Sequence, residues 1–188
     1  MYIMLPNRLT KKPFSFAEAV AAGVSRRTLQ GLLEQGDIEK LERGIYCVRK
    51  PEGSAEDEYK ASTLIVGTKS AICLLSALSH YGLTDIIPKQ TWVMTDVEKR
   101  TKAKSVRLVR RRSPKWEIGI LTKSGYHITS LERTVIETLI SPTPGLAEGI
   151  AALKTSLRQK LTTPAKLSEM AKKLGLYDRT LPYLRAAS

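Results

Sequence analysis

The chain has 188 residues, of which 42% are hydrophobic, and a formal net charge of +13 at pH 7. This length accommodates two small domains or one of medium size, and no apolar run is long enough to span a bilayer. The excess of basic residues favours a polyanionic partner, with nucleic acid first and an acidic membrane surface second.

The residues before Phe14 fit two interpretations. Residues 6–10 form either a short helix that packs Leu5 and Leu9 onto the following segment, or part of a basic arm that lies along DNA. The cations that favour an arm are Arg8, Lys11 and Lys12.

Two short helices are predicted between residues 15 and 36. Ser15 followed by Glu18 has the spacing of a capping box. Gly23 has the position of a glycine that ends a helix, and Ser25 is placed to cap the next one. This second helix has one leucine-rich face and ends at Gly36.

Two strands follow, at residues 38–41 and 45–48, so the order of elements predicts a winged helix-turn-helix. The early residues of its second helix would reach base edges in the major groove, and Gly31 would let the duplex come close. At the tip of the wing, Arg43 would meet a phosphate or the minor groove. The predicted base-contacting residues are Ser25, Arg26, Arg27, Thr28 and Gln30. The alternative is a winged helix that contacts protein, with its arginines solvated.

Three motifs of this segment occur together in one known family. They are Ala-Ala-Gly-Val-Ser-Arg at residues 21–26, the pair Leu29 and Leu33, and Arg-Gly-Ile-Tyr at residues 43–46. In this order and spacing the segment resembles the N-terminal domain of the AbiEi-type antitoxins of abortive-infection toxin–antitoxin systems.

Charge, proline and glycine at residues 49–53 indicate a linker, so we expect domains at residues 1–53 and 54–188. Ser54 caps a helix that runs to about Val66, and a second helix is predicted over residues 69–81. A strand follows at residues 91–95. The run Ala-Leu-Ser-His-Tyr-Gly-Leu-Thr at residues 77–84, followed by a proline, continues the resemblance to the AbiEi family.

The most basic part of the chain lies between Asp96 and Trp116, and it has no acid between Lys99 and Lys115. Within it, residues 105–109 are predicted to form a strand. A solvated loop explains the pattern, but phosphate binding explains it better, because clustered like charge repels itself without an anion. The candidate DNA contacts here are Arg110, Arg111 and Arg112.

Residues 117–122 and 126–129 are predicted to form a hairpin that leads into a helix capped by Ser130. Thr-Ser-Leu-Glu-Arg-Thr at residues 129–134 is the third match to the family, and we expect Glu132 and Arg133 to fix how this helix docks. Helices at residues 146–161, 164–174 and 179–184 form either a small bundle over one sheet face or, at residues 163–175, a helix-turn-helix-like piece. The predicted fold is α+β, with a winged helix followed by a mixed-sheet domain with covering helices.

Motifs for catalysis, metal binding or cofactor binding are not recognised in the sequence, and we expect no enzyme activity, no metal and no cofactor. Asp96 and Glu98 before Lys99 only faintly resemble a nuclease strand, and His80 is interpreted as a packing residue. The two cysteines are interpreted as buried thiols of a cytoplasmic protein, although the sequence leaves a disulfide between them open.

The AbiEi resemblance implies an antitoxin that also represses transcription of its own operon by binding upstream DNA repeats. It implies a nucleotidyltransferase-like toxin as the cognate partner, with direct contact left open, and no membrane partner. Two alternatives remain. One is a stand-alone transcription factor whose C-terminal domain dimerises or senses a signal. The other is a nucleic-acid-processing enzyme targeted by its winged helix.

Overall fold

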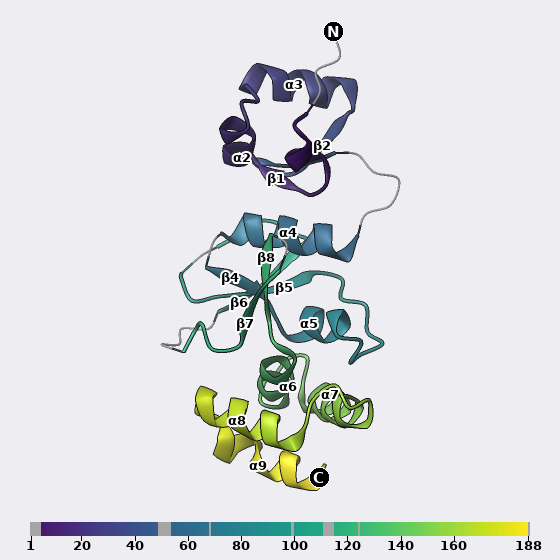
Figure 1. Ribbon diagram of the computed structural model, residues 1–188, viewed down its shortest axis with the longest axis vertical. Coiled ribbons are helices and arrows are strands. Elements are labelled where there is room, and N and C mark those ends of the chain that lie inside the picture. Colours follow the sequence, from purple (N-terminus) through teal and green to yellow (C-terminus); the bar gives the residue numbers. More distant parts are fainter. Residues whose placement is uncertain are drawn as a thin grey trace.

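The computed structural model describes residues 5–48, 54–67, 69–98, 100–110, 115–123 and 125–187. Along the long axis of the molecule lie an N-terminal unit of helices and strands, a five-stranded sheet, and a group of C-terminal helices (Figure 1). The predicted α+β class is therefore confirmed.

The N-terminal unit has three helices and a small antiparallel sheet of order β1-β3-β2. Its core contains Leu9, Phe14 and Leu29, all at least 96% buried. Of the two interpretations of residues 6–10, the helix is correct, since Leu9 is buried and Arg8 donates to the carbonyl of Ala21 at 2.7 Å. The elements are α1 (Asn7–Thr10), β1 (Phe14–Ser15), α2 (Phe16–Ala21), α3 (Arg26–Gln35), β2 (Ile38–Glu42) and β3 (Ile45–Val48).

The helix ends of this unit lie where the capping residues predict. The Ser15 hydroxyl accepts from the backbone N–H of Glu18, whose carboxylate accepts from the backbone N–H of Ser15 in return. The Ser25 hydroxyl accepts from Thr28 N–H at 3.1 Å. Helix α3 ends at Gly36 in the left-handed conformation, with φ of 77°.

The central sheet has the order β6-β5-β4-β8-β7, with parallel pairing of β4 with β8 and of β5 with β6. Helix α4 covers the face on which Ile72, Val93 and Ile128 pack with Tyr59 and Val66. The elements of this part are α4 (Ala55–Val66), β4 (Ser70–Ile72), α5 (Leu74–His80), β5 (Thr91–Thr95), β6 (Val106–Arg110), β7 (Ile120–Lys123) and β8 (Tyr126–Thr129).

The helix predicted over residues 69–81 is wrong in its first half. Strand β4 occupies Ser70–Ile72, and only Leu74–His80 are helical. Cys73 is extended and Leu74 has φ of 44°, so the chain turns sharply from strand to helix between them. Residues 70–78 are all buried, so the sequence had no alternation of exposed and buried positions to distinguish a strand from a helix.

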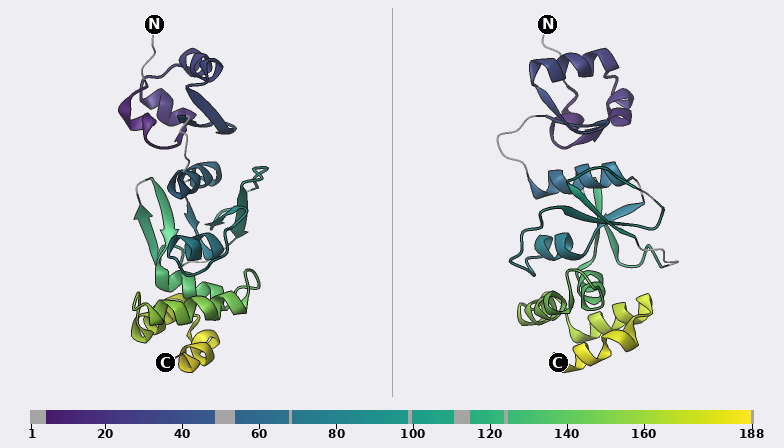
Figure 2. Two further views of the ribbon diagram at one scale, coloured as in Figure 1. Left: turned by 90° about the vertical axis from the view of Figure 1, so that its right-hand side faces the viewer. Right: turned by 180° about the vertical axis from the view of Figure 1, so that it is seen from behind.

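The C-terminal helices pack mainly around α6, which lies between them and the sheet (Figure 2). Leu78 of α5 shares their core with Val135 and Ile136 of α6. The predicted bundle therefore packs against α5 rather than directly on a sheet face. Its members are α6 (Leu131–Leu139), α7 (Leu146–Arg158), α8 (Pro164–Leu174) and α9 (Tyr177–Ala186).

Arg133 is 1% exposed and holds α6 against the segment before β7. Its Nη1 donates to the carbonyls of Trp116 and Ile118, and its Nε donates to Glu137 at 3.2 Å. Glu132 accepts from the Thr162 hydroxyl at 2.9 Å. These bonds confirm that Glu132 and Arg133 fix how α6 docks, although their partners lie in the segment before β7, in α6 itself and between α7 and α8 rather than in a strand of the sheet.

Candidate nucleic-acid interface

Helix α3 presents a polar face because its leucines point into the core. Leu29 and Leu32 are 2% and 1% exposed. The predicted base-contacting positions lie on the opposite face, where Ser25, Arg26, Arg27 and Gln30 are exposed and Thr28 is half-buried. The structure thus brings these five residues together on the first two turns of one helix.

The outer face of α3 is a shallow hollow of about 840 Å³, lined by the five residues together with Gly31 and Glu34. A Cβ built on Gly31 would meet no atom within 4 Å, so packing within the protein does not require glycine here. The open space above Gly31 is large enough for another molecule to approach the helix backbone.

Two of the predicted contacts are engaged in bonds within the helix. The Gln30 amide donates to the Glu34 carboxylate at 2.9 Å, one turn further on. The Ser25 hydroxyl, which caps α3, lies 2.9 Å from the Thr28 hydroxyl. Gln30 must therefore exchange its bond to Glu34 before it can make a two-bond contact with an adenine.

A groove of about 450 Å³ separates α3 from the β2–β3 hairpin, and we call it the α3–hairpin groove. Arg26, Lys40 and Arg43 line it together with Phe16 and Tyr46, and the described residues of the lining include no acid. None of these three cations has an ion pair among the described residues. The groove therefore presents cations that can contact the phosphates of a nucleic-acid backbone.

Sequence reasoning missed Lys40, Phe16 and Tyr46 as parts of this surface. Lys40 lies on β2 with neighbours that point the other way, so only the alternation of a strand could have indicated which face it joins. Phe16 is 38% exposed at the edge of the groove.

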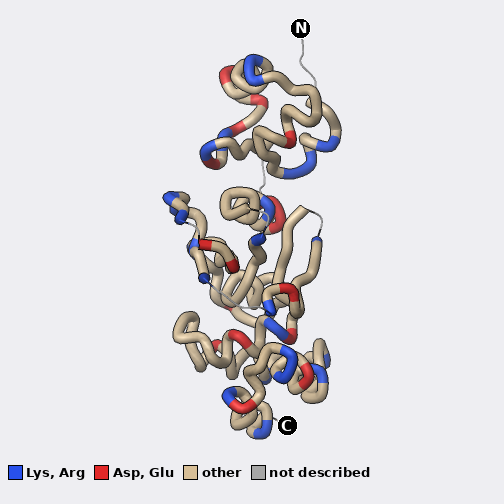
Figure 3. The backbone as a smooth tube through the Cα atoms, turned by 90° about the vertical axis from the view of Figure 1, so that its left-hand side faces the viewer, with Lys and Arg blue, Asp and Glu red and all other residues tan. Residues whose placement is uncertain are grey.

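Arg110 ends the edge strand β6 of the central sheet and is exposed. It does not lie with α3, which occupies the end of the molecule far from that sheet (Figure 1). On the same strand, the Arg107 guanidinium stacks on Trp92 at 4.1 Å from the ring centroid. Arg111 and Arg112 lie outside the described residues. Lys and Arg residues occur along the N-terminal unit and along the rest of the chain (Figure 3). Of the predicted contacts that the structure describes, Arg110 therefore lies on a different surface from those of α3.

His80 is a packing residue, as the sequence interpretation had it. Its ring meets Tyr59 and Tyr81 edge-on, at centroid distances of 5.9 and 5.1 Å. Burial lowers the pKa of His80 and nearby Lys123 lowers it further, whereas Glu56 acts in the opposite direction. Burial also raises the pKa of Tyr81 to about 12.

Groups able to hold a metal ion are not found among the described side chains, when at least three histidine, cysteine or acidic residues are required. Asp96, considered above with a nuclease strand, lies 3.8 Å from the Lys69 ammonium. Lys99 lies outside the described residues. Cys47 and Cys73 are both buried and are not joined by a disulfide, which confirms their predicted state.

Residues 7–49 match the family model described as a transcriptional regulator, AbiEi antitoxin. This match confirms the resemblance predicted from the sequence of the N-terminal unit. The fold is similar to the crystal structure of the RV2827C protein from Mycobacterium tuberculosis, with a TM-score of 0.63. That similarity covers 97% of this chain and 73% of the other at 14% identity, so it concerns the fold alone.

Comparison with curated proteins finds no match. Within the described residues, none of the helices has the length and apolar character needed to cross a membrane.

Proposed function

We propose, from the AbiEi match of residues 7–49, that the chain is a sequence-specific DNA-binding repressor. In this proposal residues 5–48 form a winged helix-turn-helix in which α3 enters the major groove and the β2–β3 hairpin is the wing. The observation that carries the proposal is the exposed polar face of α3 beside the basic α3–hairpin groove.

Helix α3 and the β2–β3 hairpin have different tasks in this proposal. Arg26, Arg27 and Gln30 read base edges from the outer face, with guanine O6 and N7 as the acceptors that suit arginine. Lys40 and Arg43 hold phosphates along the α3–hairpin groove. The β2–β3 hairpin and α3 thereby contact one strand of the duplex from two directions.

The biological role follows from the family rather than from geometry. We propose that the protein is a non-enzymatic antitoxin that represses its own toxin–antitoxin operon by binding repeats upstream of it. Its cognate toxin would be nucleotidyltransferase-like, and the proposed site of action is the cytoplasm. The domain boundary in this scheme falls between residues 53 and 54.

Binding measured by fluorescence anisotropy tests the DNA-binding role. Labelled DNA from immediately upstream of the gene is titrated with protein beside a shuffled duplex, at two salt concentrations. Phosphate contacts weaken as salt rises, whereas base contacts preserve the preference between the two sequences. A preference that survives at the higher salt is the expected result.

Equal binding that salt abolishes on both duplexes would overturn sequence-specific repression and leave only non-specific attraction. Co-expression with the neighbouring toxin gene tests the antitoxin role separately. Rescue of growth is expected, and the absence of a toxin gene beside a specific operator would favour the stand-alone transcription factor.

A further inference from the structure

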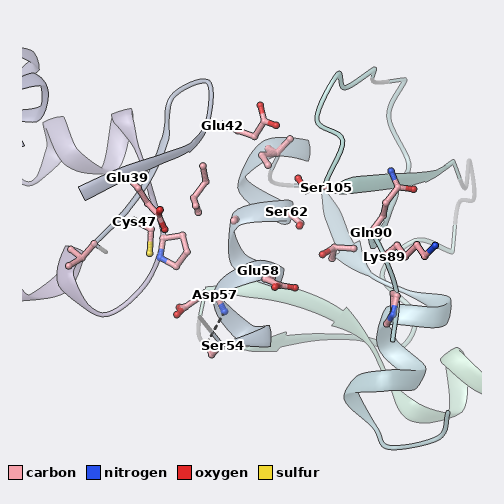
Figure 4. A pocket seen from close by; sticks show the side chains of 17 residues that line it. Glu39, Glu42, Cys47, Ser54, Asp57, Glu58, Ser62, Lys89, Gln90 and Ser105 are labelled. Carbon is pink, nitrogen blue, oxygen red and sulfur yellow. Dashed lines mark hydrogen bonds between the residues drawn. The ribbon is translucent and has the colours of Figure 1, made fainter. Parts of the chain in front are cut away.

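A cleft of about 410 Å³ lies between the N-terminal unit and α4, on the other side of the β2–β3 hairpin from the α3–hairpin groove (Figure 4). One wall is the hairpin and the other is α4, with residues 88–91 and Ser105 closing one end. The two units also meet through the Glu18 carboxylate and the Lys60 ammonium, 3.8 Å apart.

The cleft has an apolar lining. Leu41 of the hairpin is 39% exposed, and Ala61 and Ile65 of α4 contribute opposite it. Pro13, Val48 and Pro88 complete the apolar part. A volume of this size lies within the range of ligand pockets, so it accepts a few side chains of a partner rather than a folded domain.

The rim of this cleft is acidic although the protein is strongly basic. Glu39 and Glu42 belong to the hairpin, and Asp57 and Glu58 belong to α4, while Lys89 is the one cation among the described residues of the lining (Figure 4). Glu39, Glu42 and Glu58 form no ion pair with the described residues. Among the described residues, the carboxylates of Glu39, Glu42 and Glu58 therefore line the cleft without an ion-pair partner.

Strand β2 separates the two electrostatic environments. Because successive side chains of a strand point to opposite faces, Lys40 lines the α3–hairpin groove while Glu39 and Leu41 line the cleft. A polyanion is attracted to the α3–hairpin groove and repelled from the cleft.

We propose that this cleft is a docking site for a basic protein segment that alternates cationic and apolar side chains. The cationic side chains meet the rim, and the apolar ones fill the space beside Leu41 and Ile65. Charge complementarity selects this occupant, since the carboxylates of the rim attract cationic side chains at close range although the protein as a whole carries a net charge of +13. The proposal is independent of DNA binding, because it uses the opposite face of the hairpin.

The test uses the full chain and a fluorescein-labelled peptide of alternating lysine and leucine, with anisotropy as the readout. Saturable binding at a one-to-one ratio is expected, and it should weaken by about tenfold in the E39Q/E42Q/E58Q triple variant. The variant L41N should also weaken it, as should replacement of the peptide leucines by serine. All substituted side chains are at the surface, and circular dichroism verifies that each variant is folded.

The matched control is the triple variant E117Q/E148Q/D178N, which raises the net charge equally but alters no residue of the cleft lining. Unchanged peptide affinity is expected for it. Equal losses in both triple variants would mean that total charge governs binding, and would overturn the docking site. Absence of peptide binding to the unaltered protein would overturn it as well.

Discussion

Gly31 provides a test at the scale of a single residue. It lies inside α3, where alanine is more favourable than glycine by about 1 kcal/mol, and its Cβ position is open. We expect Gly31→Ala to raise the free energy of unfolding while lowering affinity for the upstream DNA by about 1–3 kcal/mol, because the added methyl group occupies the space of the duplex. Urea unfolding and anisotropy measure the two effects.

Opposite signs for stability and binding would be hard to explain without a close approach of DNA to this helix. A variant that gains stability and keeps full affinity would place the duplex elsewhere on the protein.

Arg27 and Arg43 test the division between base and phosphate contacts. Arg27→Ala is expected to cost about 1–3 kcal/mol on the upstream DNA and to relax the preference at one base position. Arg43→Ala is expected to weaken upstream and shuffled DNA alike, and to reduce the slope of log affinity against log salt by about one. Binding to single-base operator variants at several salt concentrations measures both.

If Arg27→Ala reduced affinity equally for the two duplexes, its contact would be to a phosphate. If Arg43→Ala instead weakened binding to the upstream DNA but not to the shuffled duplex, base reading would be assigned to the wing.

The sequence predicted the helix starts at capping serines correctly, because capping depends on neighbours in the chain. Ser15, Ser25 and Ser130 all cap the helices expected of them. The sequence could not predict the hydrogen bond between Gln30 and Glu34, because that bond depends on side-chain rotamers. Nor could it predict that Lys40 lies beside α3, because that position depends on how the hairpin packs against the helix.

At the scale of elements, the contact between α6 and α7 depends on Gly149. A Cβ on this residue would lie 2.7 Å from the Leu139 Cα and 2.8 Å from its nitrogen. Gly149→Ala must therefore push two helix backbones apart, and we expect a loss of about 1–3 kcal/mol in the free energy of unfolding despite the better helix propensity of alanine. Urea unfolding provides the measurement.

Gly31→Ala is the matched control, since it makes the same chemical change within a helix but at an open position. Equal effects of the two substitutions would mean that helix propensity dominates and that the α6–α7 contact tolerates expansion.

Prediction of elements from the sequence succeeded where helices carry clear ends and polar faces. Helix α8 begins at Pro164 and ends before Gly175, as expected. It failed at β4 because Ala71 and Ile72 are fully buried in the middle of the sheet, where no alternation with polar residues remains. The pairing of β4 between β5 and β8 is a long-range property that no local pattern carries.

At the scale of the whole molecule, basic residues lie both in the N-terminal unit and beyond α4, so DNA contacts either α3 and the hairpin alone or the edge of the central sheet as well. Replacing Arg110, Arg111 and Arg112 by glutamine in one triple variant tests for contact at the sheet edge. If β6 and the residues after it contact phosphates, affinity falls alike for upstream and shuffled DNA, and the salt slope falls by up to about three. The comparison variant changes Lys154, Arg158 and Lys166 to glutamine, which removes the same charge from exposed positions of α7 and α8.

A salt slope lowered only in the arginine variant would mean that the N-terminal unit and the sheet edge hold one duplex. A slope unchanged in both would confine DNA to α3 and the hairpin, and would leave the basic edge of the sheet solvated.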